Sequence, residues 1–392
     1  MPAPSLTTML QGLIASPSIS STRPQLDMSN EGVIDLLADW AESAGFTVQK
    51  LAVPGESGKF NLIATLGRGT GGLVLAGHAD TVPYDENGWQ HDPFALTEAD
   101  GRYYGLGTSD MKSFLALALE AARDLDPATL KHPLIILATA DEETSMSGAR
   151  ALAAQDLAHA RYAVIGEPTG LCPINQHKGI IMEAIIYRGQ SGHSSDPSLG
   201  NNAMEGMYQL IGELLEFRDQ LQSQHRNAAF SVPMPTLNLG HIHGGDNPNR
   251  ICADCELHID LRPLPGMPID ELRQHLRTLA SQVAGERKLQ YEFRELFGGI
   301  DAMQTDRTSA IVQAAEHLTH HSVESVAFGT EGPLLNQMGI DTLILGPGDI
   351  DQAHQPDEFL EIDRIQPTID ILKKLISRFC LEESRSRAIP TD

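Results

Sequence analysis

The sequence predicts an α/β protein in which a layered α/β domain is interrupted by a smaller α+β domain. Short apolar runs alternate with segments of helical periodicity in the first half of the chain, and the same alternation returns near its end. Between them lies a stretch with longer strand patterns and two long helical patterns, which indicates an inserted α+β unit. We therefore expect one domain from residues 1–178 and 295–392 and a second from residues 179–294.

In the layered domain, the strands are expected where a few apolar residues follow one another, and the helices where apolar residues recur every three or four positions. The expected strands are 60–66, 72–77, 134–140, 162–166 and 342–346. The expected helices are 111–125, 147–155, a segment near 307–320, a segment near 331–338, and a final one from 363 to 380.

The middle of the chain has a different pattern, with strands that follow one another without an intervening helix. Strands are expected at 180–187, 235–243, 250–262 and 288–293, and helices at 203–222 and 269–284. This order is typical of an α+β unit that folds on its own core.

The composition is that of a globular protein with a strongly acidic surface. Among 392 residues there are 28 basic and 52 acidic side chains, which give a formal net charge of −24. Because nucleic acids and anionic membranes attract basic patches, this balance argues against both as partners. The acidic excess is best interpreted as a solvated surface.

The sequence shows no membrane-spanning or targeting segment. Apolar runs such as 134–140 are far shorter than the roughly 20 residues of a spanning helix, and no basic residue precedes Arg23. Four cysteines do not make a disulfide scaffold, and Cys252 and Cys255 form a lone C-x-x-C that we interpret as structural thiols. We expect a cytoplasmic protein.

Two motifs suggest other chemistry and are set aside. Residues 67–72 match G-x-G-x-x-G, but a dinucleotide site needs this loop between a strand and a helix, whereas here it joins two strands and is expected to be a hairpin turn. Residues 192–196 contain Ser, His and Asp side by side, and neighbours in sequence cannot adopt the geometry of a catalytic triad. A nicotinamide oxidoreductase and a serine hydrolase are therefore disfavoured.

Histidine and carboxylate side chains follow the strands of the layered domain. His78 and Asp80 come directly after one apolar run, and in an extended segment both point to the same side. One of them can bind a metal while the other supports it, although an isolated H-x-D also suits a structural role. Asp110 precedes a helix, where it suits either a helix cap or a ligand.

The same arrangement recurs at three further strand ends. The acidic run Asp141–Glu142–Glu143 follows one strand, Glu167 another, and His354 lies in a Gly/Pro-rich loop after a third. Ligands of open α/β sheets bind at the carboxyl ends of the strands. Two histidines and three carboxylates, His78, Asp110, Glu143, Glu167 and His354, suit a pair of zinc-like ions.

These motifs, taken in order, resemble the dinuclear zinc amidohydrolases of the aminoacylase and carboxypeptidase-G-like family. The resemblance spans nearly the whole chain and rests on GHADTVP (77–83), WQHDPF (89–94), YGLGTSDMK (104–112), ADEE (140–143), GEPT (166–169), SGHSS (191–195) and the run 249–262. It implies a zinc-peptidase-like catalytic domain with a mixed central sheet flanked by helices. It also implies that the inserted domain is a ferredoxin-like lid and dimerisation domain, and that the protein is a homodimer.

The resemblance implies a role for each candidate residue. Asp110 would bridge two divalent ions, most plausibly Zn²⁺, with Co²⁺ as the alternative. His78 and Glu167 would complete one metal site, and Glu143 and His354 the other. Asp80 would orient His78, and Glu142 would be the general base. His193, from the partner subunit, would stabilise the oxyanion, while Asn249, Arg262, Gly329 and Thr330 would bind substrate.

Further segments narrow the implied substrate to a small acylated amino acid. HKGI (177–180), SGHSSDPSLGNNA (191–203), FGTEGP (328–333) and GPGDIDQAHQPDEF (346–359) are similar to family members that hydrolyse N2-acetyl-L-ornithine. Cys252 and Gly332 stand where the family often has Pro and Ala. A succinyl-diaminopimelate desuccinylase, a broader acylamino-acid hydrolase or dipeptidase, and a catalytically silent binding protein remain alternatives.

Overall fold

The computed structural model describes residues 4–381, and the contacts within it divide the chain into two units. The larger unit consists of Met1–Asn175, Thr305–Glu324 and Thr330–Asp392, and the inserted unit of Gln176–Gln304 and Ser325–Gly329. The ends of the expected catalytic domain, residues 1–3 and 382–392, lie outside the described residues. Each unit has its own hydrophobic core.

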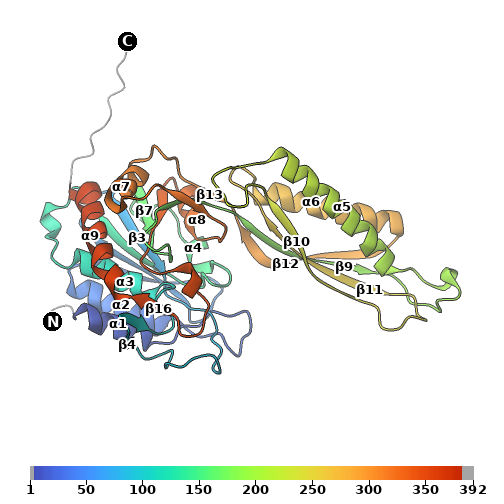
Figure 1. The fold of residues 1–392 in the computed structure, drawn as a ribbon, viewed down its shortest axis with the longest axis horizontal. Helices are drawn as coiled ribbons and strands as arrows, with labels where there is room; N and C mark the ends of the chain where they lie inside the picture. Colours follow the sequence, from blue (N-terminus) through green and yellow to red (C-terminus); the bar gives the residue numbers. More distant parts are fainter. Residues whose placement is uncertain (1–3, 382–392) are drawn as a thin grey trace, which may run out of the picture. The chain divides into compact units, whose positions relative to one another are not determined.

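The larger unit contains a mixed central sheet (Figure 1). Its strands follow one another in the order β1-β2-β6-β3-β7-β15-β8. Its four adjacent strands β6, β3, β7 and β15 are parallel, while β1, β2 and β8 pair antiparallel with their neighbours. The strands are β1 (Thr47–Ala52), β2 (Phe60–Leu66), β3 (Leu73–His78), β6 (Leu134–Thr139), β7 (Tyr162–Ile165), β8 (Ile174–His177) and β15 (Asp341–Ile344). The expected α/β fold with a mixed sheet is confirmed.

The central strands are buried on both faces because helices cover both sides of the sheet. In β3, Leu73 and Leu75 belong to one core and Val74 and Ala76 to the other, which is the alternation expected of a strand. The first core contains residues of α1 (Leu6–Ile14), α2 (Glu31–Ser43), α3 (Lys112–Ala122), α7 (Ala310–Thr319) and α9 (Ile365–Ile376). The second contains Leu335 of α8 (Gly332–Gln337) and Leu152, Leu157 and Ala160 from the segment that follows α4 (Ser147–Arg150).

A small antiparallel sheet links two loops that carry predicted site residues. It has the order β16-β5-β4, with β4 at Thr97–Ala99, β5 at Arg102–Tyr104 and β16 at Phe359–Glu361. Because β5 precedes the loop with Asp110 and β16 follows the loop with His354, their pairing fixes the two loops against each other.

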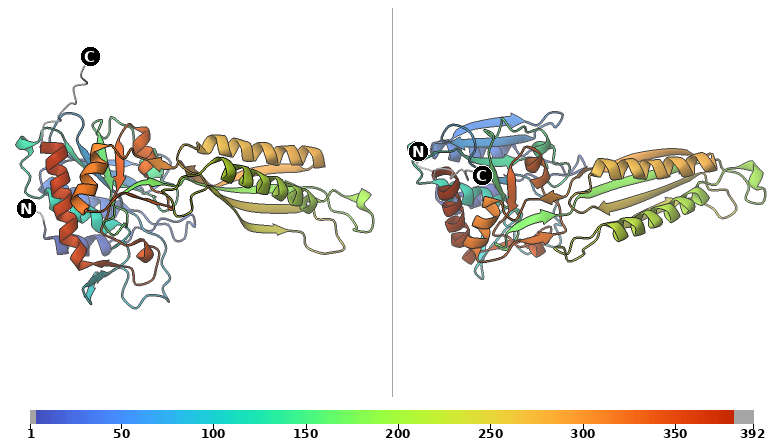
Figure 2. Two further views of the ribbon diagram at one scale, coloured as in Figure 1. Left: turned by 45° about the horizontal axis from the view of Figure 1, so that its top comes forward. Right: turned by 90° about the horizontal axis from the view of Figure 1, so that it is seen from above.

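The inserted unit is a four-stranded antiparallel sheet with two helices, in the chain order β-α-β-β-α-β (Figures 1 and 2). The sheet order β10-β11-β9-β12 is that of a ferredoxin-like fold. Its elements are β9 (Ile180–Arg188), α5 (Ala203–Gln224), β10 (Thr236–Gly244), β11 (Asp254–Arg262), α6 (Ile269–Arg287) and β12 (Gln290–Ile300). Apolar side chains of both helices and of the sheet form one core. The short strands β13 (Met303–Gln304) and β14 (Glu324–Val326) lie where the chain passes between the units.

Some details differ from the sequence-based expectations. Residues 67–72 are not a hairpin turn, because β6 lies between β2 and β3 and pairs with both. A glycine is required there at Gly72, which has φ +87 and whose Cβ would lie 2.0 Å from the carbonyl oxygen of Pro133. The helix expected at 147–155 is a single turn, and helices α1 and α2 had no counterpart in the predicted elements. Within the described residues, no helix is both long and apolar enough to cross a membrane.

Candidate metal centre

Four of the five predicted ligands lie at the carboxyl ends of the four parallel strands. His78 is the last residue of β3, Glu143 lies in the loop after β6, Glu167 follows β7, and His354 lies in the loop after β15. Since these four strands are neighbours in the sheet, one edge gathers side chains that are far apart in the sequence.

Asp110 lies between the two histidines. Its Oδ1 is 3.1 Å from Nε2 of His78, and its Oδ2 is 3.6 Å from Nε2 of His354. The Nε2 of His354 is also 3.1 Å from Oε2 of Glu143. The helix α3 begins only at Lys112 and receives no side-chain cap from Asp110, so the carboxylate serves this cluster and not the helix end.

Two groups of side chains at this edge have ligand atoms close enough to share a metal ion. In His78, Asp110 and Glu143, and likewise in His78, Glu142 and Glu167, the ligand atoms of each group all lie within 4.8 Å of one another. Imidazole nitrogens with carboxylate oxygens are a donor set that zinc-like dications accept. The residues at this edge therefore fit divalent cations, with His78 common to both groups.

Asp80 connects His78 to the acidic loop after β6. The Nδ1 of His78 lies 3.0 Å from the backbone carbonyl oxygen of Asp80 and 3.8 Å from its carboxylate, so it is the backbone of Asp80 that holds the ring. The carboxylate of Asp80 accepts hydrogen bonds from the backbone amides of Glu142 and Glu143, each at 3.2 Å. Asp80 thus supports both strand ends.

The crowded carboxylates of the cluster make it a favourable place for cations. Burial, followed by repulsion from neighbouring carboxylates, raises the pKa of Glu142 and of Glu167 well above the ordinary value. Burial alone would lower the pKa of His78, but its hydrogen bond with Asp110 and the charges of Glu167 and Asp80 raise it well above 6.5. The pKa of Asp110 is lowered: burial opposes ionisation, and the hydrogen bond and charge of His78 outweigh it. These pKa directions favour the protonated forms of Glu142, Glu167 and His78, which bound cations would oppose.

This proton occupancy gives a testable pH dependence. The hydrogen bond with Glu143 raises the pKa of His354 to about 9, so this imidazole is protonated at pH 7. A metal ligand must be neutral imidazole, so metal binding displaces the proton. We expect Zn²⁺ added to metal-free protein at pH 7 to acidify a weakly buffered solution. The number of protons that His354 releases should fall as the pH of the titration rises through about 9. Calorimetric titration in buffers of different ionisation enthalpy measures the number of protons released. The same number for the wild type and His354→Ala would contradict the release of a proton from His354.

Glu358 holds the backbone of the loop that carries Asp110, and it is not among the site residues predicted from the sequence. Its carboxylate accepts hydrogen bonds from the backbone amides of Gly107, Ser109 and Asp110 at 2.9, 2.7 and 2.9 Å. Burial raises the pKa of Glu358 to about 8 despite these bonds. In the sequence, Glu358 is one acid of the polar segment PDEF (356–359), which is typical of an exposed loop. Its position shortly after His354 is the one signal that connects it to the site.

A second buried acid near the centre, Glu331, was also not singled out. Its Oε2 accepts a hydrogen bond of 2.8 Å from Thr139, and its Oε1 is buried without a hydrogen-bond partner among residues 4–381. Burial raises its pKa to about 7, and its charge acts on both Glu142 and Glu167.

The predicted substrate-binding and oxyanion residues mostly belong to the inserted unit. His193 is exposed, and its Nδ1 lies 2.7 Å from the hydroxyl of Ser195. Asn249 is exposed, and its carbonyl accepts a hydrogen bond from the amide of Ser194, beside His193. The guanidinium of Arg262 is held by the carboxylate of Asp260 at 2.8 and 3.0 Å.

The loop 329–330 is split between the units. Gly329 belongs to the inserted unit, and Thr330 is a buried residue of the larger unit. Of the two departures from the family pattern, Gly332 is the first residue of α8, and Cys252 is a buried free thiol, as is Cys255.

Comparison with known proteins places the chain in a family. Residues 74–378 match peptidase family M20/M25/M40, so this chain belongs to that family of metallohydrolases. Among solved structures, it is similar to a tripeptidase from Staphylococcus aureus, with 19% identity, a TM-score of 0.73, and coverage of 96% of this chain and 99% of that one.

Two further solved structures share the fold. An M20 family metallo-carboxypeptidase from Sulfolobus solfataricus has 17% identity and a TM-score of 0.73, with 96% of this chain and 99% of that chain covered. A dinuclear metal-binding peptidase of the M20 family from Bacillus subtilis has 17% identity and a TM-score of 0.64, with 95% of this chain and 96% of that chain covered. The agreement covers the inserted unit as well as the larger one.

Proposed function

We propose that this M20 family enzyme hydrolyses the amide bond of N2-acetyl-L-ornithine to L-ornithine and acetate, a step of arginine biosynthesis, and is thus an acetylornithine deacetylase. The observation that carries a two-metal hydrolase is Asp110, whose two carboxylate oxygens face His78 and His354. The choice of substrate rests on the segments 177–180, 191–203 and 346–359.

In this proposal, His78 and Glu167 would hold one divalent ion, Glu143 and His354 the other, and Asp110 both. Zn²⁺ is the ion we favour, with Co²⁺ as the alternative. When bound, such ions make water a better nucleophile at neutral pH and polarise the substrate carbonyl.

Glu142 performs the proton transfers. Its backbone amide is fixed by the carboxylate of Asp80, beside that of the ligand Glu143. The Glu142 carboxylate takes a proton from the attacking water, whose oxygen forms the new bond to the acetyl carbon. It then gives that proton to the nitrogen as the C–N bond breaks, so the amine leaves neutral with acetic acid as the other product. The acid passes its remaining proton to the amine, which leaves acetate and the ammonium form of ornithine.

Most of the groups proposed to recognise the substrate belong to the inserted unit. Asn249 and Arg262, with the loop of Gly329 and Thr330, are proposed to bind the α-carboxylate. Arg262 must then exchange or share its partner Asp260, since a guanidinium offers five N–H donors and Asp260 engages two of its nitrogens.

His193 is proposed to stabilise the oxyanion in the active site of the partner subunit of a homodimer. We expect His193→Ala to lose most of its kcat while its metal content is unchanged. Mixing it with Glu142→Gln should restore part of the activity, because a dimer of the two variants contains one intact site. No recovery in mixed dimers, verified by two different affinity tags, would contradict action across the dimer.

The decisive experiment is a panel of substrates with the Zn²⁺ and the Co²⁺ enzyme. It compares N2-acetylornithine with other acetylated amino acids, N-succinyl-diaminopimelate and dipeptides, and the highest kcat/KM is expected for N2-acetylornithine. Faster turnover of the succinylated substrate or of dipeptides would move the assignment to a desuccinylase or a peptidase. Two bound metals with no turnover of any compound would favour a binding protein.

A further inference from the structure

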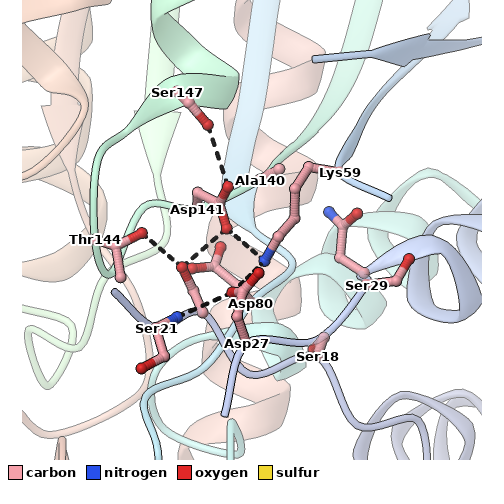
Figure 3. A network of polar contacts seen from close by, with 12 residues as sticks. Ser18, Ser21, Asp27, Ser29, Lys59, Asp80, Ala140, Asp141, Thr144 and Ser147 are labelled. Carbon is pink, nitrogen blue, oxygen red and sulfur yellow. Dashed lines mark hydrogen bonds and ion pairs between the residues drawn. The ribbon is translucent and has the colours of Figure 1, made fainter. Parts of the chain in front are cut away.

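A buried lysine, Lys59, contacts the acidic loop that follows β6 near the candidate metal centre. The Nζ of Lys59 is 2.7 Å from Oδ1 of Asp141 and 2.8 Å from Oδ1 of Asp27 (Figure 3). The side chains of Lys59 and Asp141 are only 3% and 6% exposed. Neither residue belongs to the predicted catalytic or ligand set.

The carboxylate of Asp141 is also held by hydroxyl groups. Ser20 donates to its Oδ1 at 2.9 Å, and Ser147 donates to its Oδ2 at 3.2 Å. Ser20 in turn is hydrogen-bonded to Thr144 at 2.7 Å. Both oxygens of Asp141 are therefore engaged, and Lys59 supplies the cation among these partners.

The backbone amides of the loop donate hydrogen bonds to two aspartates. The amides of Glu142 and Glu143 donate to the carboxylate of Asp80, and those of residues 144, 145 and 146 donate to the backbone carbonyl of Asp141. All five amides from 142 to 146 thus have an acceptor, and for three of them it is the carbonyl of Asp141 within the loop itself. The position of Asp141 determines how this loop presents its two glutamates.

Asn61, in β2, also holds this loop through hydrogen bonds. Lys59 and Asn61 flank Phe60 at the start of β2, so their side chains point to the same side. Asn61 accepts a hydrogen bond from the amide of Ala140 at 3.1 Å and donates to the carbonyl of Gly148 at 2.8 Å. Asn61 therefore fixes both ends of the loop, and Lys59 fixes Asp141 within it.

The backbone of the loop needs such support. Asp141 has φ +55, a left-handed conformation that non-glycine residues adopt only where surrounding contacts hold them. Three carboxylates in succession also repel one another in a buried site. Lys59 places a positive charge beside the first of them.

We propose that Lys59 and Asp141 are positioning residues, a buried ion pair that fixes the loop carrying the ligand Glu143 and the general base Glu142. The proposal rests on the proposed roles of these two glutamates. Through Glu143 the pair acts on the affinity for one metal ion, and through Glu142 on turnover.

The test replaces Lys59 by Met and Asp141 by Asn in the full chain, with Lys50→Met as the matched control. Lys50 also bridges two carboxylates of the larger unit, those of Glu31 and Asp35, but on the surface at 27% exposure. Loss of groups that support metal ligands typically lowers metal affinity or activity by roughly 10–100-fold. We expect a loss of this size in the affinity for one Zn²⁺ ion in Lys59→Met, and a smaller one in Asp141→Asn.

Kinetics provide the second readout. We expect kcat of the Zn²⁺-saturated Lys59→Met enzyme to fall by about 10-fold or more with KM nearly unchanged, and Lys59→Arg to recover part of it. Lys50→Met should match the parent in both measurements.

Two outcomes overturn the proposal. One is a folded Lys59→Met, by circular dichroism, with parental Zn²⁺ affinities and kcat. The other applies if Lys59→Met does not fold: a folded Asp141→Asn with parental values. Zn²⁺ titration needs no substrate, so it decides the positioning role even if the substrate panel rejects the proposed deacetylation.

Discussion

Glu142→Gln should retain both metal ions and lose nearly all turnover. Loss of a general acid–base group costs about 10²–10⁴ in rate, and the amide of Gln cannot take up the proton of the attacking water. Because the substitution conserves size and the Asp80 bond goes to the backbone amide of residue 142, the loop should keep its conformation. The measurement is kcat for the acetylated substrate, with bound metal determined on the same sample.

The metal content in this experiment distinguishes two roles for Glu142. Its carboxylate lies in one group with His78 and Glu167 whose ligand atoms are all within 4.8 Å, so the geometry also permits ligation. If Glu142 were a ligand, the variant would lose an ion as well as activity. Near-normal turnover would contradict both roles. Glu42→Gln, an exposed glutamate of α2, is the control for a simple change of charge.

Much of the centre could be predicted because the residues that build it have strong local signals. Apolar runs mark buried strands, and acids or histidines directly after them, such as His78 and Glu167, stand out against that background. The parallel pairing of β6, β3, β7 and β15 then brings these positions to one edge. This is why the gathering of these side chains at one edge could be expected from motif positions alone.

The residues that support the centre have no such signal. Glu358 and Lys59 look like ordinary charged residues of polar segments, and both are buried only because distant chain segments fold over them. The loop 67–72 illustrates the same limit, since its hairpin interpretation failed when β6, more than sixty residues further along, inserted between its two strands. Long-range pairing of this kind leaves no trace in local periodicity.

Asp110→Asn should remove the binding of both metal ions, which distinguishes it from changes at the ligands of a single site. Asp110 is the carboxylate that faces both histidines, and an amide offers one neutral oxygen where the carboxylate offers two that share a negative charge. His354→Ala should instead weaken one ion, because it leaves His78, Glu167 and Asp110 in place.

Metal-dependent stability gives a readout that needs no substrate. Ligands that bind only the folded protein stabilise it by RT ln(1 + [L]/Kd), about 2.7 kcal/mol at a hundredfold excess over Kd. The wild type should therefore melt at a higher temperature with Zn²⁺ than with a chelator, and Asp110→Asn should melt at the same temperature in both. His354→Ala should keep part of the shift. Two bound Zn²⁺ ions per chain of Asp110→Asn at parental affinity would show that Asp110 does not bridge the ions, and the assignment of the ligands to two sites would have to be rebuilt around Glu143 and Glu167.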